Sequence, residues 1–467
     1  MIKRSLLGAA LLAAFAAPVS AFAADEKELA AIRAQIQEMK QSYEARLQAL
    51  EQRLQDAQAA TAQAQNSAAQ LAPQAPAPAS APAPASATEP AAAPAVTPVA
   101  SSSNAFNPDI SMVLGGTYNN LSQDPYSYRI QGFMPLGGEV GPGARSFNLG
   151  ESELTMAANI DPMFAGRLTF SLTGDNQVSV EEAFVQTREL SGGLNARAGR
   201  FLSSIGYLNG QHAHTWDFVD AALAYQAFFG GQYKTDGVQL KWLAPTDTFI
   251  EVGMEAGRGA TPPGNDRNKN GVNSTALFAH AGNDIGDSAS WRAGLSYLRT
   301  SAAEREFDNA GAIGAFSGHS TVLMADAVYK WSPNGNPTQR NFKLQGEYLQ
   351  RKENGSLAND GASGDYASRQ SGWYAQAVYQ FMPAWRAGLR YDRLASGTPA
   401  IGLVGAIFPI LETYSPQRTS LMLDYSPSEF SRLRLQFARD EARSGKPDNQ
   451  IFLQYIMSLG THAAHSF

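Results

Sequence analysis

Four segments of this 467-residue chain place an aromatic side chain directly before a short turn that contains proline. They are Trp242–Phe249, Trp331–Asn334, Phe381–Trp385 and Tyr425–Phe430, and three of them end on a second aromatic residue. Roughly ten residues of alternating polar and apolar character flank each turn, which is the length of a strand that crosses a bilayer. Rings beside tight turns are typical of the boundary between hydrocarbon and water in transmembrane β-barrels. The pattern therefore predicts strands with one face toward lipid.

Residues 1–23 have the pattern of a signal peptide. Lys3 and Arg4 precede the apolar stretch from Leu6 to Pro18, and small residues follow up to Ala23. Such a stretch is too short for a membrane-spanning helix, which needs about 20 apolar residues. No later apolar run approaches that length, so the sequence excludes helical membrane spans. Cysteine is absent, which gives no support to a disulfide-stapled extracellular domain.

Residues 24–71 are predicted to form a periplasmic coiled coil. Leu29, Ile32, Ile36, Met39 and Tyr43 follow spacings of three and four, with charged and amide side chains between them. So narrow an apolar stripe needs partner helices to bury it, although a single, partly frayed helix remains the alternative. Residues 72–104 form a Pro/Ala-rich linker, because eight prolines among alanines favour an extended chain and cannot build a core.

Residues 105–467 have a period of two, which predicts an all-β domain. On one segment Leu433, Leu435 and Phe437 alternate with Arg432 and Arg434. A soluble β-sandwich shows the same alternation, but here short and longer connections alternate and the number of strands is even. The predicted fold is a transmembrane antiparallel β-barrel of about 16 strands. The predicted strand centres are 114, 154, 170, 184, 199, 239, 254, 280, 294, 326, 347, 376, 390, 422, 436 and 455. The longer connections are predicted at 121–146, 206–231, 261–274, 301–318, 355–369 and 396–416.

With lipid outside, the polar face of each strand lines the interior, and sixteen strands enclose an aqueous lumen. The predicted pore-lining residues form a basic and an acidic wall that face each other and orient a charged solute. The alternative is that these charges solvate the wall and pair with one another. The predicted pore-lining residues are Arg386, Arg390, Arg432, Arg434, Lys343, Glu151, Glu153, Glu251 and Glu347.

The connection 206–231 is too apolar to stand in water, because Phe218, Val219, Leu223, Tyr225, Phe228 and Phe229 all need a surface. We expect it to fold inward and narrow the pore, with Trp216, Asp217, Phe218 and Asp220 as its constriction residues. The alternative is an outward patch that binds a partner.

His212 and His214 form a His-x-His pair near Asp217 and Asp220, a set of side chains that suits zinc, copper or nickel. A metal site at His212 and His214 is therefore one hypothesis, although such a pair is common by chance. His462 and His465 are predicted on the other side of the membrane and cannot complete the same site. No nucleophile elbow, P-loop or zinc-protease motif is present, so we expect neither an enzyme nor a cofactor.

Gly199-Arg200-Phe201, followed by a long loop with Trp216-Asp217-Phe218, resembles the general outer-membrane porins. More loosely, the chain resembles the phosphate-selective porin O/P group. The resemblance covers the barrel from its first strand to Phe467, a terminal aromatic similar to the assembly signal of such barrels. It implies a homotrimer. Because lysines on the predicted lumen face are few, the resemblance does not extend to phosphate specificity.

The expected function is a porin for passive diffusion of small hydrophilic solutes or ions in the outer membrane of a Gram-negative bacterium. The expected partners are outer-membrane lipid, two further copies of the chain, and peptidoglycan through the N-terminal segment. A net charge of −6 without a Lys/Arg cluster excludes nucleic acid. Two alternatives remain: a receptor for metal or metal-chelate uptake, and a barrel anchor that ties the outer membrane to the cell wall.

Overall fold

The computed structural model describes residues 108–137, 139–174, 177–188, 190–309, 311–403 and 408–460. The predicted signal peptide at 1–23, coiled coil at 24–71 and linker at 72–104 lie outside the described residues. The same is true of His462, His465 and Phe467. No described helix is long and apolar enough to cross a bilayer.

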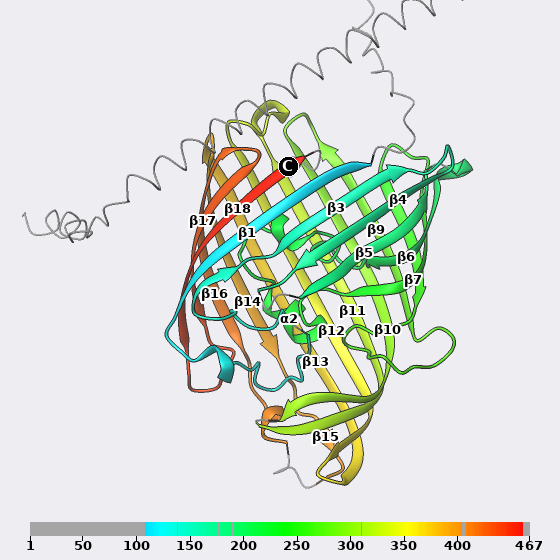
Figure 1. Ribbon diagram of the computed structural model, residues 1–467, viewed down its shortest axis with the longest axis vertical. Helices are drawn as coiled ribbons and strands as arrows, with labels where there is room; N and C mark the ends of the chain where they lie inside the picture. The colour runs from blue at the N-terminus through cyan, green and yellow to red at the C-terminus, as the bar shows by residue number, and fades with distance from the viewer. Residues whose placement is uncertain are drawn as a thin grey trace, which may run out of the picture. The chain divides into compact units, whose positions relative to one another are not determined.

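The described chain forms one closed antiparallel β-barrel (Figure 1). Of the eighteen strands in its sheet, β2 (Ser146–Leu149) and β15 (Ala400–Ile401) are short additions at the edge, which leaves sixteen in the wall. The barrel closes where β1 pairs with β18, from Ser111 opposite Gly460 to Leu121 opposite Gln450. The sixteen wall strands are β1 (Asp109–Leu121), β3 (Ser152–Asn159), β4 (Phe164–Leu172), β5 (Val178–Thr187), β6 (Leu194–Leu202), β7 (Lys234–Leu243), β8 (Phe249–Gly257), β9 (Ser274–Ile285), β10 (Ala289–Asn309), β11 (Ala312–Trp331), β12 (Asn341–Asn359), β13 (Ala362–Met382), β14 (Trp385–Ala395), β16 (Gln417–Ser428), β17 (Ser431–Asp440) and β18 (Asp448–Gly460).

The predicted fold is confirmed, since each of the sixteen predicted strand centres falls within one wall strand. The two faces of the wall are also as predicted. On β17, Leu433, Leu435 and Phe437 are 41–49% exposed on the outside, whereas Arg432 and Arg434 are buried inside. A soluble protein has the opposite arrangement, because its apolar side chains leave water. An apolar outside and a charged inside identify a transmembrane barrel.

Aromatic residues gather at one end of the barrel, where turns join β7 to β8, β11 to β12, β13 to β14 and β16 to β17. We call this the short-turn end. Trp385 and Tyr425 lie on neighbouring strands with ring centroids 4.7 Å apart. Trp242 is the penultimate residue of β7, and its indole Nε1 donates to the carbonyl of Gly192 at 3.0 Å, in the 3₁₀ turn η2 (Ser191–Gly193). A second turn of this kind, η4 (Pro333–Gly335), follows Trp331. Such rings suit the level at which the hydrocarbon ends, because they are apolar in body and carry a polar atom at the tip.

Two predicted loops are wrong. Residues 301–318 and 355–369 continue the strands, so that β10 and β11 are joined by a two-residue turn, as are β12 and β13. The physical reason is that both hairpins have an apolar surface to cover. Phe307, Phe316, Leu357 and Tyr366 point inward and are at most 2% exposed. They pack in one cluster with the connection 396–416, which contains η6 (Pro409–Leu411).

The connection between β6 and β7, residues 203–233, lies inside the barrel, and we call it the constriction loop. It contains η3 (Ala213–Thr215) and α2 (Leu223–Phe229), whose seven residues are all buried. The helix ends at Gly230, which caps it with a φ of 70° that favours glycine. The predicted inward fold of the loop is confirmed, and it buries the side chains of Tyr225, Phe228 and Phe229. The wall residues that receive this loop are Ala276, Leu298, Val322, Met324, Leu349, Tyr374 and Leu394.

The connection between β1 and β3 closes the barrel further at the end away from the short turns. It begins with η1 (Pro125–Ser127) and contributes Ile130 and Phe133 to the cluster around α2. The backbone N–H of Gln131 donates to the carbonyl of Ala442 at 3.0 Å, and that of Gly132 to Ile410 at 2.7 Å. These bonds join three connections across the mouth of the barrel.

Candidate functional site

A cavity of about 1060 Å³ opens inside the barrel at the end with the short turns, and we call it the vestibule. Pro337, Ala384 and Glu429 of those turns line its outer part, and the constriction loop lines its inner part. From the loop, Tyr207 and Asp217 reach the cavity. The charged or titratable residues along the vestibule are His212, Asp217, Glu251, His280, Arg292, Lys330, Lys343, Arg386, Glu429 and Arg432.

Asp217 anchors the tip of the constriction loop to the basic wall. One of its carboxylate oxygens lies 2.5 Å from Nζ of Lys343 on β12, and the other lies 3.4 Å from Nη1 of Arg386 on β14. Burial opposes ionisation of this carboxyl group, but Lys343 and Arg386 outweigh it and hold the pKa of Asp217 well below its usual range. Asp217 therefore stays charged at neutral pH.

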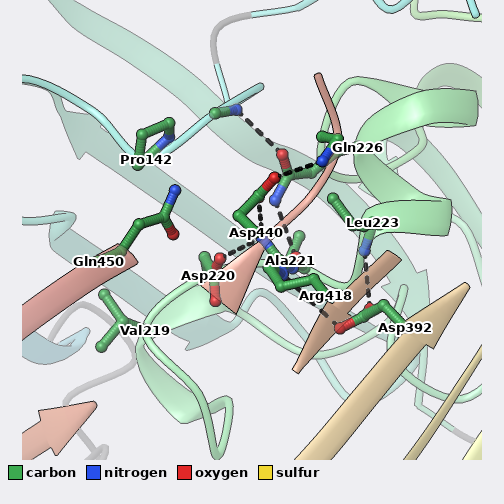
Figure 2. Close-up of polar contacts among 12 residues, drawn as sticks. Pro142, Val219, Asp220, Ala221, Leu223, Gln226, Asp392, Arg418, Asp440 and Gln450 are labelled. Atoms are coloured by element: carbon green, nitrogen blue, oxygen red, sulfur yellow. Dashed lines mark hydrogen bonds and ion pairs between the residues drawn. The ribbon is translucent and has the colours of Figure 1, made fainter. Parts of the chain in front are cut away.

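Asp220 provides a second anchor three residues further along the loop. It accepts hydrogen bonds from Arg390 at 2.7 Å and from Arg418 at 2.5 Å, on β14 and β16. Figure 2 shows Arg418 between this carboxylate, Asp392 and the backbone of Ala221. Burial again raises the pKa of Asp220, but Arg418 and Arg390 outweigh it and leave the pKa lowered. A charge buried this deeply needs such partners, because an unpaired ion in the interior is costly.

Glu347 on β12 holds the base of the constriction loop. Its carboxylate accepts from the backbone N–H groups of Tyr207 and Leu208 at 3.2 and 2.9 Å. It also accepts from the hydroxyls of Tyr225 at 2.8 Å and Tyr374 at 2.7 Å. Burial raises the pKa of Tyr225, and the charge of Glu347 raises it further. Glu347 was predicted to line a pore, but its oxygens are occupied by the loop.

The remaining predicted arginines also hold the loop. Nη2 of Arg434 donates to the carbonyl of Trp216 at 2.8 Å, and its Nε lies 2.7 Å from Asp424 on β16. Nη1 of Arg432 lies 3.4 Å from the carbonyls of His214 and Trp216 and faces the vestibule. The ring of Phe218 stacks under the guanidinium of Arg390, 4.6 Å from its centre. The loop is therefore fixed by charged groups, by carbonyls and by an aromatic face.

The predicted acidic residues form two separate groups. Glu251 on β8 lies 3.0 Å from Nζ of Lys241 and 3.2 Å from Nδ1 of His280. Glu153 on β3 lies beside His212 and His214 of the loop, and Glu151 lies close to Glu153.

Two further glutamates of β5, Glu181 and Glu182, surround the same histidine pair. Burial disfavours the charged imidazole of His212, but its hydrogen bonds to the carboxylates of Glu153, Glu181 and Glu182 outweigh burial and raise the pKa of His212 well above the ordinary value.

Glu151 and Glu153 do not face the predicted arginines across the barrel. The predicted arginines lie on β14 and β17, and Glu153 lies on β3. Only β18 and β1 separate β17 from β3 around the barrel. The prediction of opposed walls is therefore wrong for Glu151 and Glu153, because closure of the barrel brings early and late strands together. Glu251 on β8 lies on the other side of the barrel, eight wall strands from β17.

Several functional residues were missed. Arg418 and Asp424 follow the alternation of β16, so the same period-two reading would have placed them inside. Glu181 and Glu182 had no such signal, since consecutive residues of a strand normally point to opposite faces. The register of β4 and β5 slips between Thr169 and Phe170, and this β-bulge turns both glutamates inward.

No family model matches the chain. A protein of Aquifex aeolicus (strain VF5), described as uncharacterized, is 29% identical over 390 residues, which are 78% of this chain and 81% of that protein. The fold is similar to OmpT of Vibrio cholerae in its trimer form, with 11% identity, a TM-score of 0.48, and coverage of 76% of this chain and 99% of that one. It is also similar to the outer membrane channel DcaP of Acinetobacter baumannii (12% identity, TM-score 0.46, 76% and 97% covered). An anion-selective porin from Comamonas acidovorans gives 12% identity and a TM-score of 0.46, with 76% and 99% covered. These similarities do not single out the phosphate-selective group.

Proposed function

We propose that the chain is a porin-type outer-membrane channel for passive diffusion of small hydrophilic solutes or ions. The observation that carries the proposal is the vestibule, a cavity of about 1060 Å³ lined by ionised side chains within a wall whose outer face is apolar. A lipid-facing barrel with a charged aqueous interior has the physical requirements of a pore for polar solutes.

The constriction loop is the narrow part of the proposed pathway. It ends the vestibule, and its anchors at Asp217, Asp220 and Glu347 hold it against the wall. A solute that enters from the short turns therefore meets Asp217, Lys343 and Arg386 before the apolar cluster around α2. We infer small conductance in the native state and larger conductance when the anchors are weakened.

The charges of the vestibule favour anions. Its five arginines and lysines are Arg292, Lys330, Lys343, Arg386 and Arg432, against the three carboxylates of Asp217, Glu251 and Glu429. Ion pairs reduce both signs. Asp217 pairs with Lys343 and Glu251 with Lys241, while Arg386 pairs with Asp424 and Arg292 with Asp326. A cavity with an excess of one sign raises the local concentration of the opposite ion. A moderate preference for anions follows.

Planar bilayers test both parts of the proposal. The purified protein is expected to give discrete conductance steps, and a salt gradient is expected to give a reversal potential of the sign for anions. Arg432→Gln should move that potential toward cations, whereas Lys352→Gln, on the part of β12 that alternates with the inward Arg351 and Glu353, should leave it unchanged. Absence of any conductance would contradict the channel, and equal reversal potentials in the two variants would contradict the role of Arg432.

Experiments on the same purified protein distinguish the channel from the two alternative functions. A metal-chelate receptor should bind its cargo tightly and conduct poorly in every variant. A cell-wall anchor should keep normal conductance when residues 25–100 are deleted, and the cell envelope should lose cohesion. We also infer a homotrimer, on the resemblance of the loop motif to porins, and sedimentation of the detergent-solubilised protein measures it.

A further inference from the structure

Two histidines of the constriction loop meet three glutamates of the wall in a compact, buried group. Nδ1 of His212 lies 3.1 Å from Glu153 and 3.2 Å from Glu181. Nδ1 of His214 lies 2.7 Å from the other oxygen of Glu153. The side chains of these four residues are at most 10% exposed. Three separate parts of the chain supply them: β3, β5 and the loop.

We propose that Glu153, His212 and His214 form a binding site for a divalent transition-metal ion of the zinc class, with Glu181 beside His212. One ligand atom each of Glu153, His212 and His214 lies within 4.8 Å of the other two. Zinc takes histidine nitrogens and carboxylate oxygens at about 2.0–2.2 Å, so that neighbouring ligand atoms of a tetrahedron lie about 3.3–3.6 Å apart. The two contacts between Glu153 and the histidines, 3.1 and 2.7 Å long, need to widen by less than an ångström to reach this spacing.

The second nitrogen of His212 has the partner that a metal-bound histidine needs. Its Nε2 lies 3.2 Å from Glu182, which leaves Nδ1 directed at Glu153 and Glu181. Glu182 itself is held by the backbone N–H of Leu202 at 3.2 Å. Histidines that bind metal usually place a carboxylate on the other ring nitrogen, which fixes the tautomer and the orientation of the ring.

The charge around the group also favours a cation. Glu151, Glu153, Glu181 and Glu182 gather here, and their cationic partners are Arg167, 3.7 Å from Glu182, and the imidazole of His212. Buried carboxylates in excess of their cationic partners are unfavourable, because little water remains to solvate them. A divalent ion would offset this excess, and the two imidazoles favour a transition metal over Mg²⁺ or Ca²⁺.

An entry path reaches the site from the short-turn end of the barrel. His212 lines the vestibule and also a second cavity of about 440 Å³, whose lining includes Glu182 and Arg167. An ion in the vestibule can therefore reach His212 without disturbing the wall. Since the ligands come from the loop and from β3, the bound ion would hold the loop against that strand.

The test uses the mature protein in detergent, stripped with a chelator. His462→Ala and His465→Ala are present in every sample, so that the C-terminal histidines cannot bind the ion. Isothermal titration with Zn²⁺ is expected to give one ion per chain, and Co²⁺ in its place should give the visible absorption of a four-coordinate site. His214→Ala and Glu153→Gln should weaken zinc at least about tenfold, and Glu182→Gln, through orientation alone, about 10–100-fold. His319→Ala, at an exposed histidine of β11, is the matched control and should bind as the parent does.

Zinc should also raise the melting temperature of the parent and of His319→Ala, but not that of His214→Ala. Glu182→Gln covers the case in which a ligand variant fails to fold, because this residue does not itself hold the ion. Failure of the parent to bind Zn²⁺ would overturn the site. So would unchanged zinc affinity in folded His214→Ala, Glu153→Gln and Glu182→Gln. Bilayer conductance is independent of both outcomes, so the proposed channel stands or falls separately.

Discussion

The carboxylate of Asp220 accepts a hydrogen bond from Nη2 of Arg390 at 2.7 Å, and this contact joins the constriction loop to the wall of the barrel. The two residues are 170 positions apart in the sequence. The side chain of Arg390 is 2% exposed and that of Asp220 is 11% exposed, so loss of either residue leaves a largely buried charge without its partner.

Asp220→Ala is expected to destabilise the protein by about 3–5 kcal/mol, because it leaves Arg390 and Arg418 buried without their shared carboxylate. The freed loop should also raise the single-channel conductance. Unfolding in denaturant and bilayer recording measure the two effects. Glu306→Ala, at an exposed carboxylate of β10, is the control and should change neither. A wild-type conductance in Asp220→Ala would contradict the role of the loop as the narrow part of the channel.

The ion pairs that Asp217 and Asp220 make with the wall should weaken only below about pH 4. The pKa values of Asp217 and Asp220 lie below the value of about 3.9 for an unfolded aspartate. A lowered folded pKa contributes stability that is fully present above about pH 4 and is lost as the pH falls through the folded value. The melting temperature should therefore fall more steeply below pH 4 in the parent than in the double variant Asp217→Asn, Asp220→Asn. Parallel pH profiles would show that these carboxylates do not anchor the loop.

Gly199→Ala should impair folding of the barrel. Gly199 has a φ of 129°, and a Cβ at this position would collide with the backbone of Ala183 and Phe184 on β5. Strain of this kind costs about 1–3 kcal/mol, to which the collision adds. Gly210→Ala is a matched control within the loop, because its Cβ meets no atom within 4 Å. Heat-modifiable mobility on gels compares the folded fractions, and equal fractions would contradict the expected clash.

Leu435→Arg tests the lipid-facing surface. Leu435 lies in the middle of β17 and is 49% exposed on the outside. A charged side chain near the middle of the bilayer costs about 2–4 kcal/mol in a barrel. Glu306→Arg, on the long extension of β10, should cost little. Unfolding of both variants in lipid vesicles decides the matter, and equal stability would mean that Leu435 does not contact hydrocarbon.

The strands were predictable because lipid outside and water inside force a strict period of two. The hairpin at β12 and β13 carried its own signal, since Asp360 and Gly361 both have positive φ, the conformation that Asp-Gly supplies in two-residue turns. The apolar composition of the loop also predicted its inward fold. Its anchors were not predictable, because pairs such as Asp220 and Arg390 depend on where a long connection settles. The β-bulge at Glu181 and Glu182 was not predictable either, because strict alternation would place one of the two side chains on the lipid-facing side.

The seam between β1 and β18 has a consequence for biogenesis. Its two strands come from the opposite ends of the described chain, so the wall is incomplete until the final strand has been delivered. The polypeptide between β6 and β7 precedes β18 in the chain and is attached at the rim, so its helix can enter through the open end of the cylinder. The step that completes the wall is therefore the pairing of the last strand with the first.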